Sequence, residues 1–438
     1  MMIVSRRSLF VLAFCLGFFL LPGCRTETVG RGEASISNAW SSVRVDSGIV
    51  ARPTLTVLPD TNIAMVAWFK RVNDTWGVFV RRYVGGSANG EDVLRLDGDV
   101  GAVRAHEQAP PVIVSGRDGR AYVSWTTRTG SSPSGEDPGD VWIARSLDYG
   151  KTWQQPVRVN QGSSSAQGPL AASHTFHDVV VTPSGTVVVS WIDTRNQVAA
   201  QQASRGGHAA VDGGMPIQRV HDDFVGGKGA EVRIAVSRDE GQTFEETTIL
   251  DSRTCPCCQT ALAVAPNGAV YAAWRHIFSG NERDIVMAVS GDEGATFSKP
   301  RRVYRDAWKI TACPHTGPSI VASADSVGVL WYTGAEGRAG SYWLMDHANA
   351  PSNAAALPER VGSSEALLRH DAARINGQWV IAMEDGMSGE TVLYPDTVSI
   401  TGTRPSLAAM GELAMVTTIT EGAVYLQAVN VAATVRSQ

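Results

Sequence analysis

Short apolar segments that end in tryptophan recur along the chain. Five of them stand at 63–68, 121–125, 186–191, 269–274 and 326–331, each after another short apolar run and a small turn such as PSG, PNG or RDG. Runs of this length, bounded by turn residues, are typical of β-strands. The pattern therefore predicts a repeated strand–turn–strand unit.

A second repeat follows three of these units. The segments SLDYGKTW (146–153), SRDEGQTF (237–244) and SGDEGATF (290–297) share the pattern S-x-D-x-G-x-T-[W/F]. An Asp side chain accepts backbone N–H groups in a tight turn, and Gly supplies a positive φ. We expect structural hairpin turns built by three pairs: Asp148 with Gly150, Asp239 with Gly241, and Asp292 with Gly294.

The two repeats combine into a four-stranded antiparallel unit, and radial repetition of such units is a β-propeller. Two weaker units follow at 372–385 and 405–418. The segment AWSSVRV (39–45) resembles an outermost strand and is expected to complete the last unit. We predict an all-β propeller of seven four-stranded blades, closed by an N-terminal strand. Six blades remain the alternative if the last two units merge.

The Asp turns resemble the Asp-box repeats of the sialidase superfamily. The resemblance covers nearly all of the mature chain and implies a sialidase-like β-propeller. It indicates the fold more than the activity, because Asp boxes also occur in propellers that are not sialidases. The motifs CPCC, CPHTGP and WRH together resemble a subgroup of exported bacterial proteins that are sialidase-like only through their Asp boxes.

The N-terminus has the pattern of an export signal. Two arginines, Arg6 and Arg7, precede an apolar run from Leu9 to Leu21, which is short for a membrane span. The following LPGC resembles a bacterial lipobox and implies lipidation of Cys24. The segment SRRSLF (5–10) also resembles the twin-arginine export motif, so the general and the twin-arginine routes both stay open.

These features predict a signal peptide over 1–23, a lipidated tether over 24–37 and one propeller domain over 38–434. The protein is expected in the cell envelope, periplasmic or at the cell surface, and anchored to the membrane through Cys24. Its net charge of −5 and the absence of a basic run give no indication of a nucleic-acid partner. We expect a monomer.

Propeller geometry sorts the loops onto two faces. Asp turns lie on one face, while the blade-to-blade links lie on the other face, near the axis. Every cysteine of the mature chain other than Cys24 maps to this second face. Of the nine histidines only His347 maps to the Asp-turn face. The segregation predicts one axial pocket rich in His, Cys and Arg.

The sialidase resemblance implies a glycosidase reading of this pocket. Sialidases hold a substrate carboxylate with three arginines and use a Tyr–Glu nucleophile pair and an Asp acid/base. The matching positions here are Arg52, Arg275 and Arg404 for the clamp, Asp178 for the acid, and Tyr332 with Glu384 for the nucleophile. Two features depart from the pattern: the Arg-Ile-Pro signature is only ARPT here, and Tyr332 precedes the last arginine.

A second hypothesis is a metal site. Thiolates with nearby imidazoles suit Cu(I) or Zn(II), and the candidate ligands are Cys255, Cys257, Cys258, Cys313, His315 and His276. The same thiols could instead form disulfides. The least strained full pairing joins Cys255 to Cys258 and leaves Cys257 for Cys313.

A third hypothesis is a binding scaffold without chemistry. The Gly-rich insertion at 206–230 has the composition of a lid or docking loop. The sequence therefore leaves three functions open: an exo-glycosidase acting on acidic glycans, a protein that binds copper or zinc, and a non-catalytic protein- or glycan-binding scaffold.

Overall fold

The computed structural model describes residues 42–85, 87–129, 138–161, 172–196, 218–219, 229–312, 314–347, 356–366, 369–385, 388–395 and 397–431. The expected signal peptide, the tether with Cys24, most of the insertion at 206–230, and Cys313 lie outside these ranges. Residues 33–438 group into one compact unit. No helix within the described ranges is both long and apolar enough to cross a bilayer.

The described strands form six sheets, in which neighbouring strands are almost all antiparallel. The first contains β2 (Val50–Val57), β3 (Ile63–Val72), β4 (Thr75–Val84) and β5 (Leu94–Arg95). The second contains β6 (Ala102–Val103), β7 (Val112–Ser115), β8 (Ala121–Arg128), β9 (Val141–Ser146) and β10 (Val157–Arg158). Two later sheets contain β20 (Ser319–Ala322), β21 (Ser326–Thr333), β22 (Gly340–His347) and β23 (Glu359–Val361), and β24 (His370–Ile375), β25 (Gln378–Glu384), β26 (Glu390–Tyr394) and β27 (Val398–Thr401).

The largest sheet has nine strands and two regular parts. One part contains β11 (His174–Val181), β12 (Val187–Asp193), β14 (Ala230–Ser237) and β15 (Glu245–Thr254), with β13 (Gln218–Arg219) parallel to β15. The other contains β16 (Ala261–Val264), β17 (Val270–Ile277), β18 (Arg283–Ser290) and β19 (Arg301–Arg302), with the 3-10 helix η3 (Ser279–Asn281) after β17. A single residue pair, Thr254 with His276, connects the two parts.

The N-terminal strand belongs to the same sheet as the last three strands. This sheet contains β28 (Thr403–Met410), β29 (Leu413–Thr420), β30 (Ala423–Asn430) and β1 (Val43–Ser47). Strand β1 pairs with β30 in an antiparallel register in which Val43 lies opposite Leu426. The two ends of the described chain are therefore joined by main-chain hydrogen bonds.

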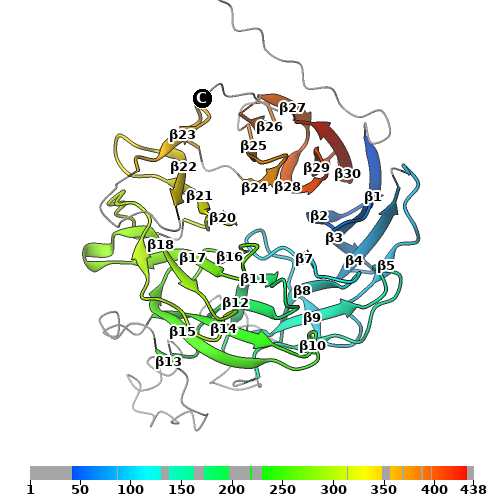
Figure 1. Cartoon of the computed structure of the whole chain (residues 1–438), viewed down its shortest axis with the longest axis horizontal. Coiled ribbons are helices and arrows are strands. Elements are labelled where there is room, and N and C mark those ends of the chain that lie inside the picture. Colours follow the sequence, from blue (N-terminus) through cyan, green and yellow to red (C-terminus); the bar gives the residue numbers. More distant parts are fainter. Residues whose placement is uncertain are drawn as a thin grey trace, which may run out of the picture. The chain divides into compact units, whose positions relative to one another are not determined.

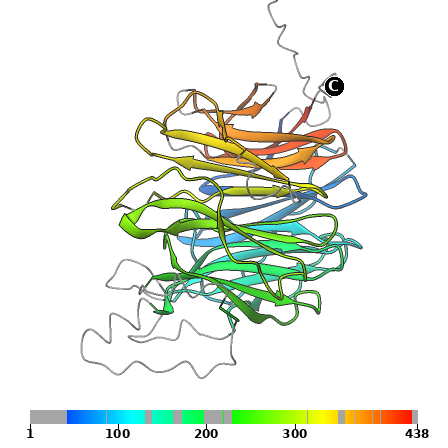
Figure 2. The same ribbon diagram turned by 60° about the vertical axis from the view of Figure 1, so that its left-hand side comes forward.

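The first strands of the four-stranded units lie at the centre (Figure 1). Each contacts the next in the order β2, β7, β11, β16, β20, β24 and β28, and β28 contacts β2 again. Figure 2, turned by 60° from this view, shows successive sheets stacked against one another. Loops that precede the first strands consequently converge at the centre.

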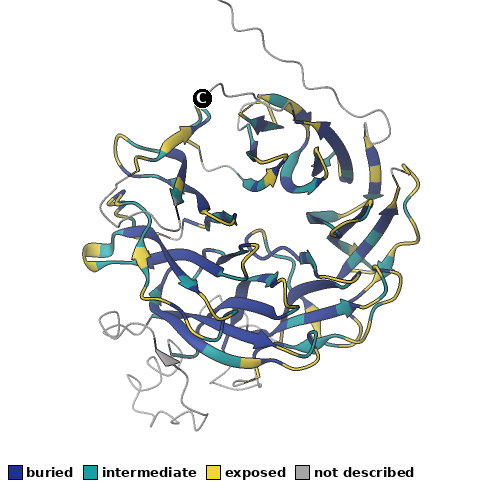
Figure 3. Ribbon diagram, viewed as in Figure 1, coloured by how far each residue is buried: buried dark blue, intermediate teal, exposed yellow. Residues whose placement is uncertain are grey.

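The tryptophans that end the predicted strands lie at the core of the packing. Trp68, Trp125, Trp191, Trp274 and Trp331 are among the largest fully buried side chains. The buried residues follow the inner and middle strands, while the outer edges are exposed (Figure 3). Nearly continuous apolar runs fit this position, because a strand covered on both faces buries successive side chains.

Three of these tryptophans also bind an Asp of the preceding sheet or sheet part. The indole Nε1 of Trp68 donates to Asp46 of β1 at 3.0 Å, and that of Trp274 donates to Asp251 of β15 at 2.6 Å. Trp331 donates to Asp306, which follows β19, at 2.7 Å. A buried indole N–H needs a partner, so each bond fixes how one unit sits on the next.

The three Asp turns have the expected local chemistry. In each turn the Asp carboxylate accepts the backbone N–H of the Thr four residues later, at 2.8–2.9 Å, and its hydroxyl at 2.6 Å. The turn glycines have φ values of 80°, 81° and 86°. The turns thus close hairpins and expose no catalytic arrangement.

We expect Trp331→Phe to destabilise the protein more than Trp125→Phe. Both indoles are buried, but Trp125 Nε1 has no hydrogen-bond partner among the described residues, whereas Trp331 Nε1 binds Asp306. Loss of a hydrogen bond to a buried carboxylate costs about 1–3 kcal/mol beyond the shared loss of packing. Urea unfolding of both variants measures the difference. Equal losses would contradict a stabilising role of the indole–Asp bond.

Candidate functional site

Four residues near the centre share a rare backbone conformation. Arg52, Phe176, His315 and Arg404 have positive φ values between 50° and 57°. Three of them, Arg52, Phe176 and Arg404, fall at register shifts in the pairing of a first strand with its second strand. Non-glycine residues seldom adopt this conformation, and bulges re-aim side chains next to functional sites. The bulges therefore identify where the first strands present side chains.

An arginine cluster lies at these positions. It contains Arg52 of β2, Arg369 directly before β24, and Arg404 of β28, together with Glu107 from the loop between β6 and β7 and Glu384 at the end of β25. Arg404 Nη2 lies 3.1 Å from Glu107 Oε2. Glu384 accepts the backbone N–H of Arg404 at 2.6 Å and that of Arg369 at 3.3 Å, so it fixes two of the three arginines.

The arginine cluster brings three like charges together. Burial and then the neighbouring charges of Arg369 and Arg404 lower the pKa of Arg52 to about 10, although Glu107 and Glu384 oppose this shift. Glu107 and Glu384 face the three guanidinium groups, and Asp371 also interacts electrostatically with Arg52. Arg52 Nε has no hydrogen-bond partner among the described residues, yet part of Arg52 remains accessible to water. Such a group favours an anion beside it.

Two histidines and one aromatic ring border the cluster. The ring of His106 makes an edge contact with Phe176 at 5.3 Å between centroids and lies 6.5 Å from the ring of His315. Burial, followed by the charges of Arg104 and His315, lowers the pKa of His106 to about 4. His106 Nδ1 accepts the backbone N–H of Gln108, so a neutral ring carries its proton on Nε2.

The predicted acid Asp178 connects two neighbouring first strands. Its carboxylate accepts the backbone N–H of Val179 at 2.8 Å and that of Leu262, in β16, at 2.7 Å. Asp371 does the same between β24 and Leu407 of β28. Burial raises the pKa of Asp178 to about 7 and that of Asp371 to about 6. The raised pKa suits an acid, but both oxygens of Asp178 already accept backbone N–H groups.

Arg275 and Tyr332 do not take the positions that the sialidase resemblance implies. The buried guanidinium of Arg275 donates to the carbonyl oxygens of Thr316, Arg283 and Tyr332 at 3.2, 2.8 and 2.8 Å. Arg369, which the sequence did not single out, accompanies Arg52 and Arg404 instead. The Tyr332 hydroxyl donates to the carbonyl of Glu365, and no hydrogen bond among the described residues joins Tyr332 to Glu384.

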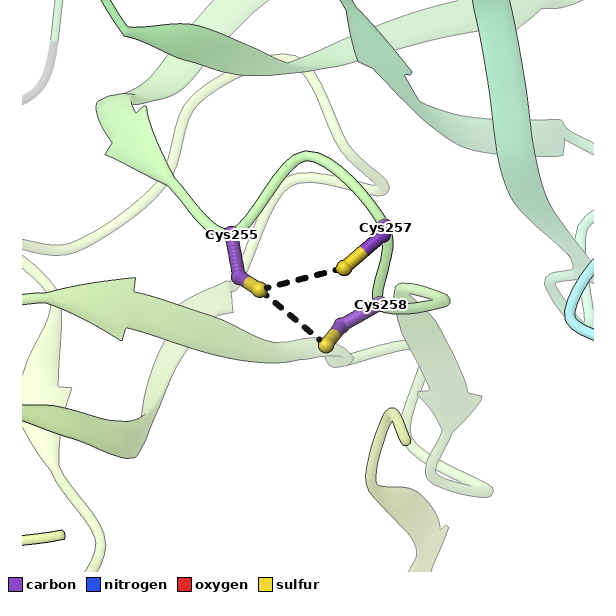
Figure 4. A group of neighbouring side chains, drawn as sticks. All are labelled: Cys255, Cys257 and Cys258. Carbon is purple, nitrogen blue, oxygen red and sulfur yellow. Dashed lines mark hydrogen bonds between the residues drawn. The ribbon is translucent and has the colours of Figure 1, made fainter. Parts of the chain in front are cut away.

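Three cysteines converge in the link between β15 and β16 (Figure 4). Cys255 Sγ lies 3.7 Å from Cys257 Sγ and 3.2 Å from Cys258 Sγ, and all three sulfurs lie within 4.8 Å of one another. The three are buried as free thiols, not as disulfides. Hydrogen bonds from Cys257 and Cys258 lower the pKa of Cys255, and burial raises the pKa of Cys258. We call these residues the cysteine corner.

The other three predicted metal ligands, His276, His315 and Cys313, do not all lie at the cysteine corner. His276 Nδ1 lies 2.7 Å from Asp251 Oδ2, so this ring faces the acceptor of the Trp274 indole. His315 borders the arginine cluster through its ring contact with His106. Cys313 lies outside the described residues. Further downstream, Gly317 packs against Gln259, the residue that follows the cysteine corner, so closely that a Cβ would overlap the Gln259 carbonyl.

Sequence reasoning missed Arg369 and did not assign a role to His106 or Glu107. All three residues lie in links that the sequence analysis assigned to the pocket face, so their general location was predictable. Arg369 directly precedes the His370–Asp371 pair that opens β24. Its participation depends on side-chain direction, which a single sequence with no regular motif at this point does not specify.

Comparison with known proteins identifies the fold but no family. No known family and no curated protein matches the chain. A protein of unknown function from Dyadobacter fermentans is 12% identical with a TM-score of 0.52, covering 90% of this chain and 98% of its own. An ulvan lyase bound to –[GlcA(1-4)Rha3S]– is 11% identical with a TM-score of 0.50, covering 91% and 94%. A Hadza microbial sialidase is 12% identical with a TM-score of 0.43, covering 82% and 74%.

These similarities extend over most of the chain at low sequence identity. Together with the antiparallel sheets arranged around a centre, the two matches with TM-scores of 0.52 and 0.50 show an all-β, propeller-like fold. They assign no activity, because unrelated functions occur on the same fold.

We expect His106 to stay neutral until the pH falls close to 4. Its lowered pKa means that the folded state favours the neutral ring. The stability that this contributes is complete above the unfolded pKa of about 6.5 and is lost as the pH falls toward 4. Imidazole NMR signals report the midpoint, and His106→Gln assigns the signal by removing it. A midpoint above about 6 would show that the ring is neither buried nor close to Arg104 as described.

Proposed function

We propose that the described sheets form a propeller of seven blades closed by β1. The closed sequence of contacts among seven first strands supports this count. So does the single pair that joins the two parts of the nine-stranded sheet, because each part alone has the four-strand order of a blade. In this arrangement the arginine cluster lies on the axis, where all seven units contribute links.

The main proposed function is binding of a carboxylate-bearing ligand, such as an acidic glycan, at the arginine cluster. The observation that carries the proposal is the convergence of the three like charges of Arg52, Arg369 and Arg404, where burial and the neighbouring arginines lower the pKa of Arg52 and that of Arg369. A planar guanidinium matches a carboxylate with two parallel hydrogen bonds. A ligand carboxylate would reduce the repulsion among the three arginines and supply an acceptor for their N–H groups.

The protein would present this site outside the cytoplasm, tethered to a membrane through a lipid on Cys24. Exo-glycosidase activity remains the alternative use of the same site. A non-catalytic role fits the hydrogen bonds better, because Glu384 and Asp178 both hold backbone amides. The glucuronate-containing saccharide bound to the ulvan lyase indicates a suitable class of test ligands.

We expect Arg52→Gln and Arg404→Gln to weaken binding of uronate and sialate oligosaccharides by about 10- to 100-fold. Each substitution removes charge-assisted hydrogen bonds to the carboxylate, which contribute about 1.5–3 kcal/mol. Calorimetric titration measures the affinity. The matched control is Arg374→Gln, which removes an exposed arginine outside the cluster, on β24.

Two outcomes would contradict the binding proposal. One is equal affinity of the Arg404 and Arg374 variants, and the other is equal affinity for acidic saccharides and their neutral counterparts. Turnover of a fluorogenic sialoside that is lost in Tyr332→Phe would favour the glycosidase instead. Absence of turnover across several sialosides would reject the glycosidase and leave the binding proposal intact.

The cysteine corner supports a second proposed function, binding of copper or zinc. Three buried sulfurs that share one small volume carry this proposal. Soft thiolates select these two metals over hard cations. The site is separate from the arginine cluster in its ligands, so one function can fail without the other.

We expect protein purified without chelators to contain about one equivalent of copper or zinc, and Cys258→Ser to lose it. The reason is that a missing thiolate removes one of the three described ligands. Elemental analysis by mass spectrometry measures the bound metal, and thiol titration in denaturant counts the free cysteines. Metal-free protein with no reactive thiols would contradict the proposal and favour the disulfide pairing.

A further inference from the structure

The cysteine corner has the ligand number, burial and surrounding charge of a copper(I) site rather than a zinc(II) site. We propose that Cys255, Cys257 and Cys258 bind one Cu(I) ion with three thiolate sulfurs and no further ligand. This choice of ion and coordination rests on the metal-binding function proposed above. It is supported by three independent properties of the described residues.

The first property is the geometry of the sulfurs. Three sulfurs placed around one ion at bond lengths of about 2.3 Å lie about 4 Å apart in a trigonal arrangement. Cys255 Sγ is 3.7 Å from Cys257 Sγ and 3.2 Å from Cys258 Sγ, and no pair exceeds 4.8 Å. The thiols thus need shifts of less than an ångström to surround an ion (Figure 4).

The backbone holds this corner in place. The N–H of Cys255 donates to the carbonyl of Arg275 at 2.9 Å, and the Thr254 hydroxyl donates to the same carbonyl at 3.1 Å. On the other side, Thr260 donates to the carbonyl of Phe176 through both its N–H and its hydroxyl. A link fixed at both ends presents its ligands with little ordering cost on binding.

The second property is that the described residues supply three ligands and no fourth. Among the described residues, the group of His, Cys, Asp and Glu atoms close enough to share an ion consists of these three sulfurs. Cys255, Cys257 and Cys258 expose only 0%, 5% and 1% of their surfaces, so water has little access. Protein-bound Zn(II) almost always has four ligands, either four side chains or three with an open water position. Cu(I) is satisfied by three thiolates.

The third property is the charge around the corner. Arg283 Nη1 lies 3.4 Å from Cys255 Sγ, and Arg275 also acts electrostatically on this sulfur. Three thiolates with Cu(I) carry a net charge of −2, whereas the same ligands with Zn(II) carry −1. Arg275 also interacts with the buried carboxylate of Asp306, and Arg283 lies directly beside the sulfur. Attraction to these two guanidinium groups favours the more negative complex, which is that of the monovalent ion.

The test is a metal competition with the full chain purified under reducing, anaerobic conditions. Cu(I) is titrated against bicinchoninate, and Zn(II) is titrated in parallel against a chromophoric chelator. We expect one equivalent of Cu(I), a thiolate-to-copper absorption band in the ultraviolet, and no displacement of Cu(I) by excess Zn(II). Cys255→Ser, Cys257→Ser and Cys258→Ser should each abolish tight binding.

Two further variants separate the details. Cys313→Ser is the matched cysteine control and should keep one equivalent of Cu(I) at unchanged affinity, because three sulfurs suffice. Arg283→Gln should keep the stoichiometry and lower the affinity by about 10-fold, the usual effect of removing a group that supports metal ligands. Thermal unfolding checks that each variant folds. If a single-cysteine variant of the corner does not fold, the Cu(I) affinities of Arg283→Gln and Cys313→Ser test the inference in its place.

The outcomes distinguish this inference from the proposed function. Tight Zn(II) binding that Cu(I) does not displace, or loss of the site in Cys313→Ser, would overturn three-coordinate Cu(I) and leave metal binding intact. Failure to bind either metal with all thiols reduced would overturn both. Retention of Cu(I) in the three single-cysteine variants would place the metal elsewhere and also overturn the inference.

Discussion

The bond from a buried indole to an Asp of the preceding unit is the interaction on which the arrangement of the sheets depends. Antiparallel pairing holds each sheet together, but it does not orient one sheet on the next. The bonds of Trp68, Trp274 and Trp331 do this with direction as well as contact area. The Trp68 bond is the most informative, because its acceptor Asp46 lies on the N-terminal strand β1 and also binds Lys70. It ties that strand to the sheet that follows it in sequence.

Much of this fold could be predicted from the sequence because its determinants are local. The tryptophan-ended runs and the Asp turns recur as short motifs that are visible in the sequence. The structure places strands at all five runs and hairpins at all three turns. The β1 pairing was also within reach, since residues 39–45 resemble an outer strand. Within the described residues this strand is β1, which starts at Val43, and residues 39–41 lie outside the described ranges.

The candidate site was harder to predict for a physical reason. Whether an arginine faces the centre depends on bulges and side-chain direction, and neither leaves a periodic signal. Arg275, which lies within β17, and Arg369, which directly precedes β24, illustrate this. The guanidinium of Arg275 donates its hydrogen bonds to three backbone carbonyls, whereas Arg369 belongs to the arginine cluster. The grouping of Cys255, Cys257 and Cys258 was predictable without side-chain directions, because their spacing in the sequence keeps their sulfurs near one another.

The two candidate sites share structural supports although they share no ligand. Arg275 holds the carbonyl of Thr316 while its own carbonyl anchors Cys255, and Arg369 reaches the carbonyl of His315. The segment that contains His315 and Thr316 therefore lies between the cysteine corner and the arginine cluster. A change at one site has a short covalent and hydrogen-bonded route to the other.

The four positive-φ positions near the centre have a wider consequence for how such a molecule diversifies. Arg52, Phe176, His315 and Arg404 have the same backbone conformation with three different kinds of side chain. The backbone at these points therefore keeps one conformation whichever side chain it carries. Exchanging a few residues there would give a new recognition surface on an unchanged scaffold. Two proteins with identical turns and tryptophans need not bind related molecules.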